Sequence, residues 1–226
     1  PTAEGVLYEL DLRLRPSGNK GPVATRLAAF EKYQAEEAWT WEHMAMTRGR
    51  VVAGDPHFTA RVEMALETVL SASRDLRKVD TDVAEMRSLI EQEKSPKGPF
   101  DFKLMPGGLI DLEFIAQSAA MTGRFEGARS TSTETVLAHL NDPRLTLEQR
   151  GILVTAHRFF SAQTQILRLC LNNDLGEDEL NETLLEIMCR AADMPDGETF
   201  AAHVKNTAGQ VRTVFNLLFR GTHRKA

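Results

Sequence analysis

The sequence has little of several residue types, and each shortage excludes a class of protein. Its 226 residues include only two cysteines, Cys170 and Cys189, and both lie among apolar residues with helical spacing. We therefore expect buried, reduced thiols and no disulfide framework. No long apolar run and no N-terminal signal segment occur, so we expect no membrane association and a cytoplasmic location.

Motifs that commonly bind nucleotides or metals are also missing. Neither G-x-x-x-x-G-K-S/T nor G-x-G-x-x-G occurs, which excludes P-loop chemistry and Rossmann dinucleotide binding. His43 has no second His or Cys at the spacing of a zinc site. The formal net charge is −5, so we expect no nucleic-acid-binding surface over the protein as a whole.

The most regular pattern in the chain is a strict alternation of apolar and charged residues over positions 7–15. A period of two predicts a β-strand with one buried face, and Pro16 ends it. Residues 23–25 are a short candidate for a second strand. A strand that buries one face needs a sheet, and no later segment is a convincing strand. We therefore expect most of the sheet to lie upstream, in a longer protein. The apolar positions of the alternation are Tyr8, Leu10, Leu12 and Leu14.

The charged face of this strand places one carboxylate, Asp11, beside the guanidinium groups of Arg13 and Arg15. Carboxylates bind hard cations such as Mg²⁺, and arginines bind phosphate oxygens in pairs, so the pattern suits a metal-bound polyphosphate. The alternative is a solvated face whose opposite charges neutralise each other. Ser17 and Gly18, which follow, belong either to a phosphate-binding loop or to a plain hairpin connection.

From residue 27 onward the apolar residues recur at helical spacing. Asp55 and Pro56 predict the start of one helix, and Thr146 with Gln149 forms a capping box for the longest. Residues 131–134 resemble a second box, and residues 93–99 are the clearest linker. The last three long helices suit an up-down bundle. Apolar stripes predict helices over residues 27–34, 39–52, 58–70, 79–90, 109–121, 147–170, 180–191 and 200–218.

Longer motifs carry a resemblance to a known family. The motifs lie at residues 11–18 (DLRLRPSG), 29–30 (AF), 33–34 (YQ), 37–43 (EAWTWEH), 50–56 (RVVAGDP) and 107–117 (GGLIDLEFIAQ). In their residues, their order and their spacing, these motifs closely resemble those of the glutamine synthetase adenylyltransferase family. Proteins of this family carry two related nucleotidyltransferase units, and the EAWTWEH wording resembles the C-terminal, adenylylating unit.

The resemblance implies an activity and a set of site residues. The parent protein is expected to transfer AMP from ATP to a tyrosine of glutamine synthetase, with Mg²⁺ as cofactor. Asp11 matches one catalytic, metal-binding carboxylate, and the other two are expected upstream, so the chain alone should not catalyse. The implied nucleotide- or phosphate-binding residues are Arg13, Arg15, Ser17, Gly18 and Lys103.

The resemblance also implies a mainly α fold that begins with the remnant of a nucleotidyltransferase palm. Residues 1–26 are expected to hold one or two palm strands, residues 27–95 helices packed on the palm, and residues 96–226 a C-terminal helical bundle. Two other functions stay open. The helices could form an interaction module that docks glutamine synthetase or a PII-type regulator, or the chain could belong to the deadenylylating, phosphorolytic unit.

The glycine pair at 107–108 also allows two interpretations. It opens a helix that carries Asp111 and Glu113 in its first turn, and acidic residues there suit the helix dipole, which is an architectural role. The functional alternative is that the glycines bring the backbone close to a bound nucleotide, with Lys103 and Asp111 nearby.

Overall fold

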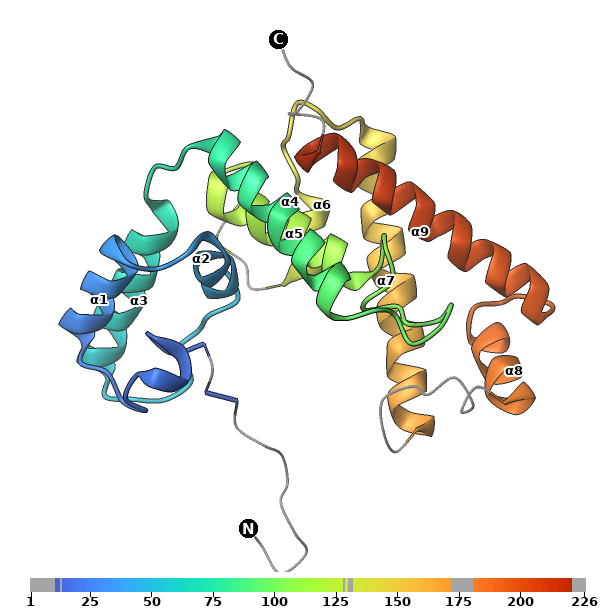
Figure 1. Ribbon diagram of the computed structural model, residues 1–226, viewed down its shortest axis with the longest axis horizontal. Coiled ribbons are helices and arrows are strands. Elements are labelled where there is room, and N and C mark those ends of the chain that lie inside the picture. Colours follow the sequence, from blue (N-terminus) through green and yellow to red (C-terminus); the bar gives the residue numbers. More distant parts are fainter. Residues whose placement is uncertain (1–10, 13, 128, 130–131, 172–180, 221–226) are drawn as a thin grey trace, which may run out of the picture. The chain divides into compact units, whose positions relative to one another are not determined.

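The computed structural model describes residues 11–12, 14–127, 129, 132–171 and 181–220. The chain is mainly helical, as the sequence predicts (Figure 1). By internal contacts it divides into two compact units, Pro1–Ala72 and Ser73–Ala226. Residues 94–99 of the predicted 93–99 linker are non-helical, but they join two helices within the second unit. The assignment of the parts of the chain to a palm and a bundle stays a prediction.

The described part of the first unit contains a 3₁₀ turn, η1 (Gly18–Lys20), and three α-helices. Both α1 (Leu27–Glu36) and α2 (Thr40–Met46) pack against α3 (Pro56–Ser71). The predicted start of α3 is confirmed, because the Asp55 carboxylate accepts the N–H groups of His57 at 3.0 Å and Phe58 at 3.1 Å. Helix α2 ends at Met46, short of the predicted residue 52.

The palm strands are not confirmed. Residues 1–10 and Arg13 lie outside the described residues, and the part of 11–26 that is described contains no strand. Leu12 and Leu14 are exposed, at 43% and 63%, and residues 23–25 form a bend at 23–24 and no strand. A strand persists only when its backbone groups pair with a neighbouring strand. The described residues offer no such partner here.

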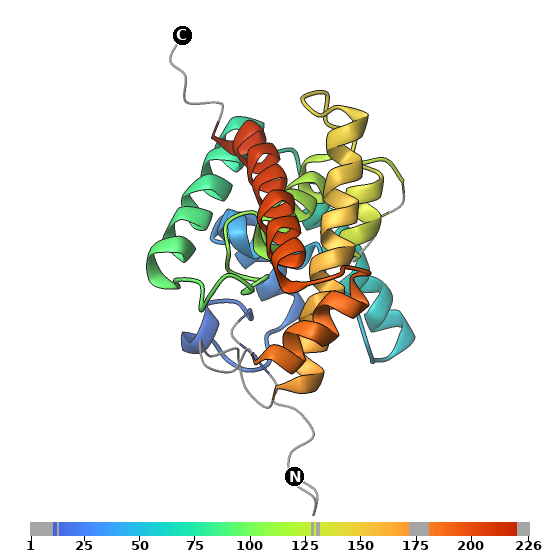
Figure 2. The same cartoon turned by 90° about the vertical axis from the view of Figure 1, so that its right-hand side faces the viewer.

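The second unit is built around α5 (Leu109–Thr122). This helix packs against α4 (Leu76–Glu93), α6 (Thr133–Ala138), α7 (Leu147–Cys170) and α9 (Gly197–Phe219). In Figure 2, α4 and α7 stand on opposite sides of it. Helix α8 (Glu182–Ala191) packs on α7 and α9. Helix α5 is central because most of its residues are apolar and more than half of them are buried.

Helices α7 and α9 run in opposite directions, as expected for neighbours in an up-down bundle. Arg144, just before α7, donates to the carbonyl of Leu218, near the end of α9, at 2.8 Å. Phe102 fills the space beside them, stacked on Phe160 with ring centroids 5.6 Å apart. The loop that carries Phe102 forms turns instead of the brief extended segment predicted at 100–104.

Local signals in the second unit are largely confirmed. Thr146 and Gln149 form the predicted capping box of α7. The N-cap of α6 is Ser132, and Thr131 lies outside the described residues. Cys189 is buried as predicted, but the prediction for Cys170 is wrong, because this last residue of α7 is exposed. The predicted stop at 172–176 lies outside the described residues. Within the described ranges, none of the helices combines the length and hydrophobicity needed to cross a membrane.

Candidate functional site

Three of the residues predicted to bind the nucleotide, Arg15, Ser17 and Gly18, lie in a tight turn of the first unit. Asp11 is exposed and outside regular structure, and Arg13 is not among the described residues. The guanidinium of Arg15 donates to two backbone carbonyls, those of Leu12 at 2.6 Å and Gly21 at 3.2 Å. Arg15 therefore closes the turn that follows the predicted strand.

The backbone turns sharply two residues after Arg15. Ser17 and Gly18 both have positive φ angles, 61° and 53°, and Gly18 donates to the carbonyl of Arg15 at 2.8 Å. A left-handed backbone is easy for glycine but strained for serine. The turn leads into η1, so the plain hairpin that the sequence allowed is not formed by the described residues.

The donor set does not make a metal site by itself. Mg²⁺ takes six oxygen ligands, usually with one or two carboxylates among them. Asp11 is a single exposed carboxylate, and the described part of the chain holds no group of three or more His, Cys, Asp or Glu side chains that could bind a metal ion. Mg²⁺ bound here would need ligands from elsewhere.

Lys103, the remaining predicted phosphate-binding residue, belongs to the second unit. It is exposed and lines a cavity of about 670 Å³ between the ends of α4 and α7 and the loop that joins α4 to α5. Asp111, which the sequence placed near it, points into a different environment.

Asp111 is the centre of a buried ion-pair cluster. Its carboxylate is fully buried and accepts hydrogen bonds from Nε of Arg87, from Nη1 of Arg212 at 2.9 Å and from the N–H of Gly107 at 2.7 Å. Arg87 is also fully buried and donates to the carbonyls of two loop residues, at 3.0 and 3.3 Å. The cluster joins α4, α5, α9 and the loop before α5, so the role of Asp111 is architectural.

Glu91 extends this cluster toward the surface. Its carboxylate lies 2.6 Å from Nη2 of Arg212 and 3.5 Å from Nη2 of Arg220. It also lies 3.5 Å from Nη1 of Arg87, one helical turn earlier on α4. The side chain of Glu91 is 28% exposed, so these outer pairs are partly screened by solvent and contribute less than the buried pair.

The glycine pair before α5 serves close packing. A Cβ atom at Gly107 would lie 1.9 Å from the carbonyl oxygen of Ala208 in α9, and φ there is +82°. A Cβ atom at Gly108 would lie 2.4 Å from the carbonyl oxygen of Phe102. Both positions therefore need glycine because backbone, and not a ligand, approaches them. Of the two interpretations of this motif, the structure supports the architectural one.

A second buried cluster joins the start of α4 to the segment after α5 and to the segment before α7. Asp80, only 2% exposed, pairs with Arg124 at 2.7 Å and with Arg144 at 2.9 Å. Arg144 also pairs with Asp142 at 2.7 Å, and Asp142 is 3% exposed. Because each buried carboxylate meets a guanidinium, their desolvation is offset.

This second cluster makes stability depend on pH. Burial opposes ionisation of Asp142, but hydrogen bonds from Arg144 and the charges of Arg144 and Arg124 hold the pKa of its carboxyl below the usual value. The folded state then binds fewer protons than the unfolded state as the pH falls below about 4. We expect the free energy of unfolding, from urea titrations, to fall through this range as the pH approaches the lower, folded pKa. In Asp142→Asn this component should be absent. An unchanged pH dependence in the variant would contradict the assignment.

The burial of Asp80 and Arg87 in the core was not predicted from the sequence. A signal was present, because both lie on the apolar stripe of α4: the buried residues of this helix are Val79, Asp80, Val83, Ala84 and Arg87. A charged residue on an apolar stripe is rarely left unpaired. The pattern predicts partners, but it does not say which residues they are.

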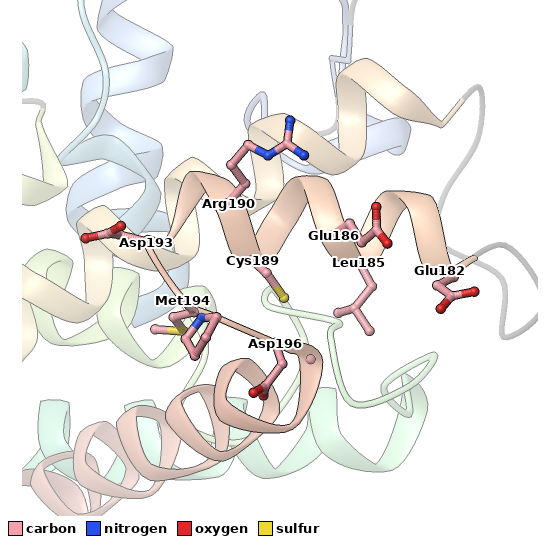
Figure 3. A pocket seen from close by; sticks show the side chains of 10 residues that line it. Glu182, Leu185, Glu186, Cys189, Arg190, Asp193, Met194 and Asp196 are labelled. Carbon is pink, nitrogen blue, oxygen red and sulfur yellow. The ribbon is translucent and has the colours of Figure 1, made fainter.

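A further cavity, of about 880 Å³, lies between α8 and the start of α9 (Figure 3). Cys189 and Leu185 face the start of α9, while Arg190 points away from it. Burial raises the pKa of the Cys189 thiol, and the charge of Asp196 adds to this effect. The thiol is therefore kept protonated and is poorly suited to act as a nucleophile. Asp196 caps α9 through the N–H of Thr199 at 2.7 Å, which lowers the pKa of its carboxyl.

Together these features define a mainly helical chain whose second unit is held by buried ion pairs, and in which the described residues form no complete catalytic centre. Comparison with known protein families finds two models that match the chain. A model described as glutamate-ammonia ligase adenylyltransferase matches residues 1–65, and one described as GlnD PII-uridylyltransferase matches residues 83–219, more than half of the chain. The chain belongs to the glutamine synthetase adenylyltransferase family, as its motifs predicted.

Three bacterial relatives illustrate the likeness, and each is named bifunctional glutamine synthetase adenylyltransferase/adenylyl-removing enzyme. The protein of Brucella suis is 50% identical over 96% of this chain, and that of Mesorhizobium japonicum is 49% identical over 97%. The protein of Rhizobium meliloti is 44% identical over 95%. The chain spans only 22% of the length of each of these relatives.

Proposed function

We propose that the chain is part of a cytoplasmic nucleotidyltransferase that transfers AMP from ATP to a tyrosine of glutamine synthetase and so regulates nitrogen assimilation. The observation that carries this proposal is the 50% identity, over 96% of the chain, to a relative named for adenylyl transfer to and removal from glutamine synthetase. In the reaction the tyrosine oxygen bonds to the α-phosphorus of ATP and loses its proton. The bond from that phosphorus to the oxygen it shares with the β-phosphate breaks, and pyrophosphate leaves.

In this proposal Asp11 supplies one carboxylate to a Mg²⁺ site. The other ligands come from parts of the full-length protein beyond the described residues, because one carboxylate does not hold this ion firmly. The arginines bind phosphate oxygens, whose negative charge grows as pyrophosphate leaves. The chain by itself is therefore expected to be inactive. The proposed phosphate-binding residues are Arg13, Arg15, Ser17, Gly18 and Lys103.

Transfer of label from α-labelled ATP to unmodified glutamine synthetase tests the proposal. We expect the full-length protein to label glutamine synthetase, and Asp11→Asn to slow transfer by about 10²-fold or more, because one ionised ligand of the metal is lost. The 226-residue chain should be silent. Lys32→Gln, at an exposed lysine of α1, is a matched control that should keep full activity.

Two outcomes would change the assignment. If Asp11→Asn leaves the labelling of glutamine synthetase unchanged but abolishes phosphate-dependent removal of AMP, this chain belongs to the deadenylylating unit. If Asp11→Asn leaves both activities unchanged, Asp11 is not a metal ligand.

A second candidate function is favoured by the match of residues 83–219 to the GlnD PII-uridylyltransferase model. We propose that the second unit is a docking module for glutamine synthetase or for a PII-type regulator. Such binding should persist in the 226-residue chain and should not depend on Mg-ATP. Sedimentation of the chain with each purified partner, with and without Mg-ATP, separates this function from nucleotide-dependent recognition.

A further inference from the structure

The cavity beside Lys103 gathers positive charge in a chain that is negative overall. Its lining includes Lys94, Lys97, Lys103 and Arg168, against the two carboxylates of Glu93 and Asp101. The chain as a whole has a net charge of −5. This concentration of cations is therefore a local feature, and it costs electrostatic repulsion in the absence of a ligand.

The carboxylate of Asp101 accepts hydrogen bonds from two backbone donors. One of its oxygens accepts the N–H of Lys97 at 3.1 Å and the other accepts the N–H of Leu104 at 3.0 Å. Lys94, Lys103 and Arg168 make no ion pair with any residue that the structure describes. Lys94 and Arg168 also suit the negative ends of α4 and α7. Lys103 lies on a loop and has no such role.

The loop that carries Lys97 and Lys103 is held in place before any ligand arrives. Asp101 closes its turns, and the buried Arg87 donates to the carbonyls of Leu104 at 3.0 Å and Met105 at 3.3 Å. Ordering a flexible loop lowers affinity, so a loop already fixed by buried contacts favours binding. The side chains, and not the helix N-terminus, supply the donors, because the first amides of α5 already bond to the carbonyls of Phe102 and Lys103.

The floor of the cavity is apolar. Phe102, Ile110 and Leu167 line it, and each is buried. The volume, about 670 Å³, is in the range of small-molecule sites. A ligand that matches both the basic side chains and the apolar floor has an anionic group, which the lysines and the arginine bind, and a flat apolar group, which packs on the floor.

We propose that this cavity binds a phosphate ester with an aromatic ring, the class that includes nucleotides. The phosphate meets Lys103 and Arg168, and the ring lies on the floor formed by Phe102, Ile110 and Leu167. The proposal rests on the phosphate-binding role proposed for Lys103 but not on transfer of AMP, and it gives the second unit a ligand site of its own.

Methyl NMR of the 226-residue chain, labelled at Ile and Leu, tests this with phenyl phosphate as the probe. We expect saturable shifts at the methyl groups of Ile90, Leu104, Ile110 and Leu167, which line the cavity. Lys103→Gln and Arg168→Gln should each weaken binding about threefold to fivefold, because each removes one charge from a partly solvated site. Arg158→Gln, at an exposed arginine of the same helix, is the matched control and should bind as the wild type does.

Three further probes and one further variant distinguish this proposal from its alternatives. AMP should shift the same methyl groups, benzyl alcohol should not, and Asp11→Asn should bind phenyl phosphate normally. The proposal is overturned if benzyl alcohol gives the same shifts, if Lys103→Gln and Arg168→Gln bind like Arg158→Gln, or if inorganic phosphate binds as tightly as phenyl phosphate. Loss of binding in Asp11→Asn would instead assign the probe to the proposed catalytic site. Normal thermal unfolding of each variant shows that the fold is intact.

Discussion

Replacing Asp111 with alanine is expected to lower the free energy of unfolding by about 3–5 kcal/mol. The reason is that Arg87, which is fully buried, would lose its closest anionic partner. It would retain two carbonyl acceptors and the more distant carboxylate of Glu91, 3.5 Å away. A buried cation left without a close counter-charge is among the most destabilising changes a core can receive.

Urea denaturation followed by circular dichroism measures this loss. Glu134→Ala is a matched control, because it also removes a carboxylate from an ion pair, with Arg158 at 2.8 Å, but both side chains are largely exposed. It should cost about 1 kcal/mol or less. If Asp111→Ala also costs less than about 1 kcal/mol, the buried cluster does not hold the helices together.

Gly107→Ala is expected to cost about 2–4 kcal/mol. A Cβ atom there would lie 1.9 Å from the oxygen and 2.7 Å from the carbonyl carbon of Ala208, so backbone atoms of α9 would have to move. The φ angle of +82° adds strain for any residue other than glycine. The shift would also disturb the 2.7 Å hydrogen bond from the Gly107 N–H to Asp111.

A glycine in an open helical position provides a control of opposite sign. Gly151 lies in the exposed first turns of α7, and a Cβ atom there would meet no atom within 4 Å. Gly151→Ala should stabilise the protein by about 0.5–1 kcal/mol, because alanine loses less backbone entropy in a helix. If Gly107→Ala is as harmless as Gly151→Ala in the same urea titration, α9 does not pack on this loop as closely as the structure indicates.

These two expectations explain why the 107–117 motif is so specific. Gly107 and Gly108 let the loop approach its neighbours, and Asp111 then meets arginines from α4 and α9. The motif therefore fixes the position of the loop that carries Lys103. Its effect on any ligand in the adjacent cavity is indirect, through the placement of that loop.

The predicted palm strand shows that an alternating sequence pattern does not by itself determine a strand. The alternation over 7–15 remains an accurate description of the residues, but a strand also needs a partner edge, and the described chain supplies none beside it. The candidate site residues share this dependence. Asp11, a single carboxylate, gains a metal-binding role only when further oxygen ligands stand around the same ion.

The sequence by itself determined the features that depend on neighbours within a few residues. The helices, the Asp55 cap of α3 and the capping box of α7 could be predicted because their partners lie one turn away. Only the tertiary structure decided the role of Asp111, whose partner Arg212 lies 101 residues along the chain, and of Asp80, whose partner Arg144 lies 64 residues along. Helical periodicity states that a charged side chain faces the core. Which distant charge meets it depends on how the helices pack.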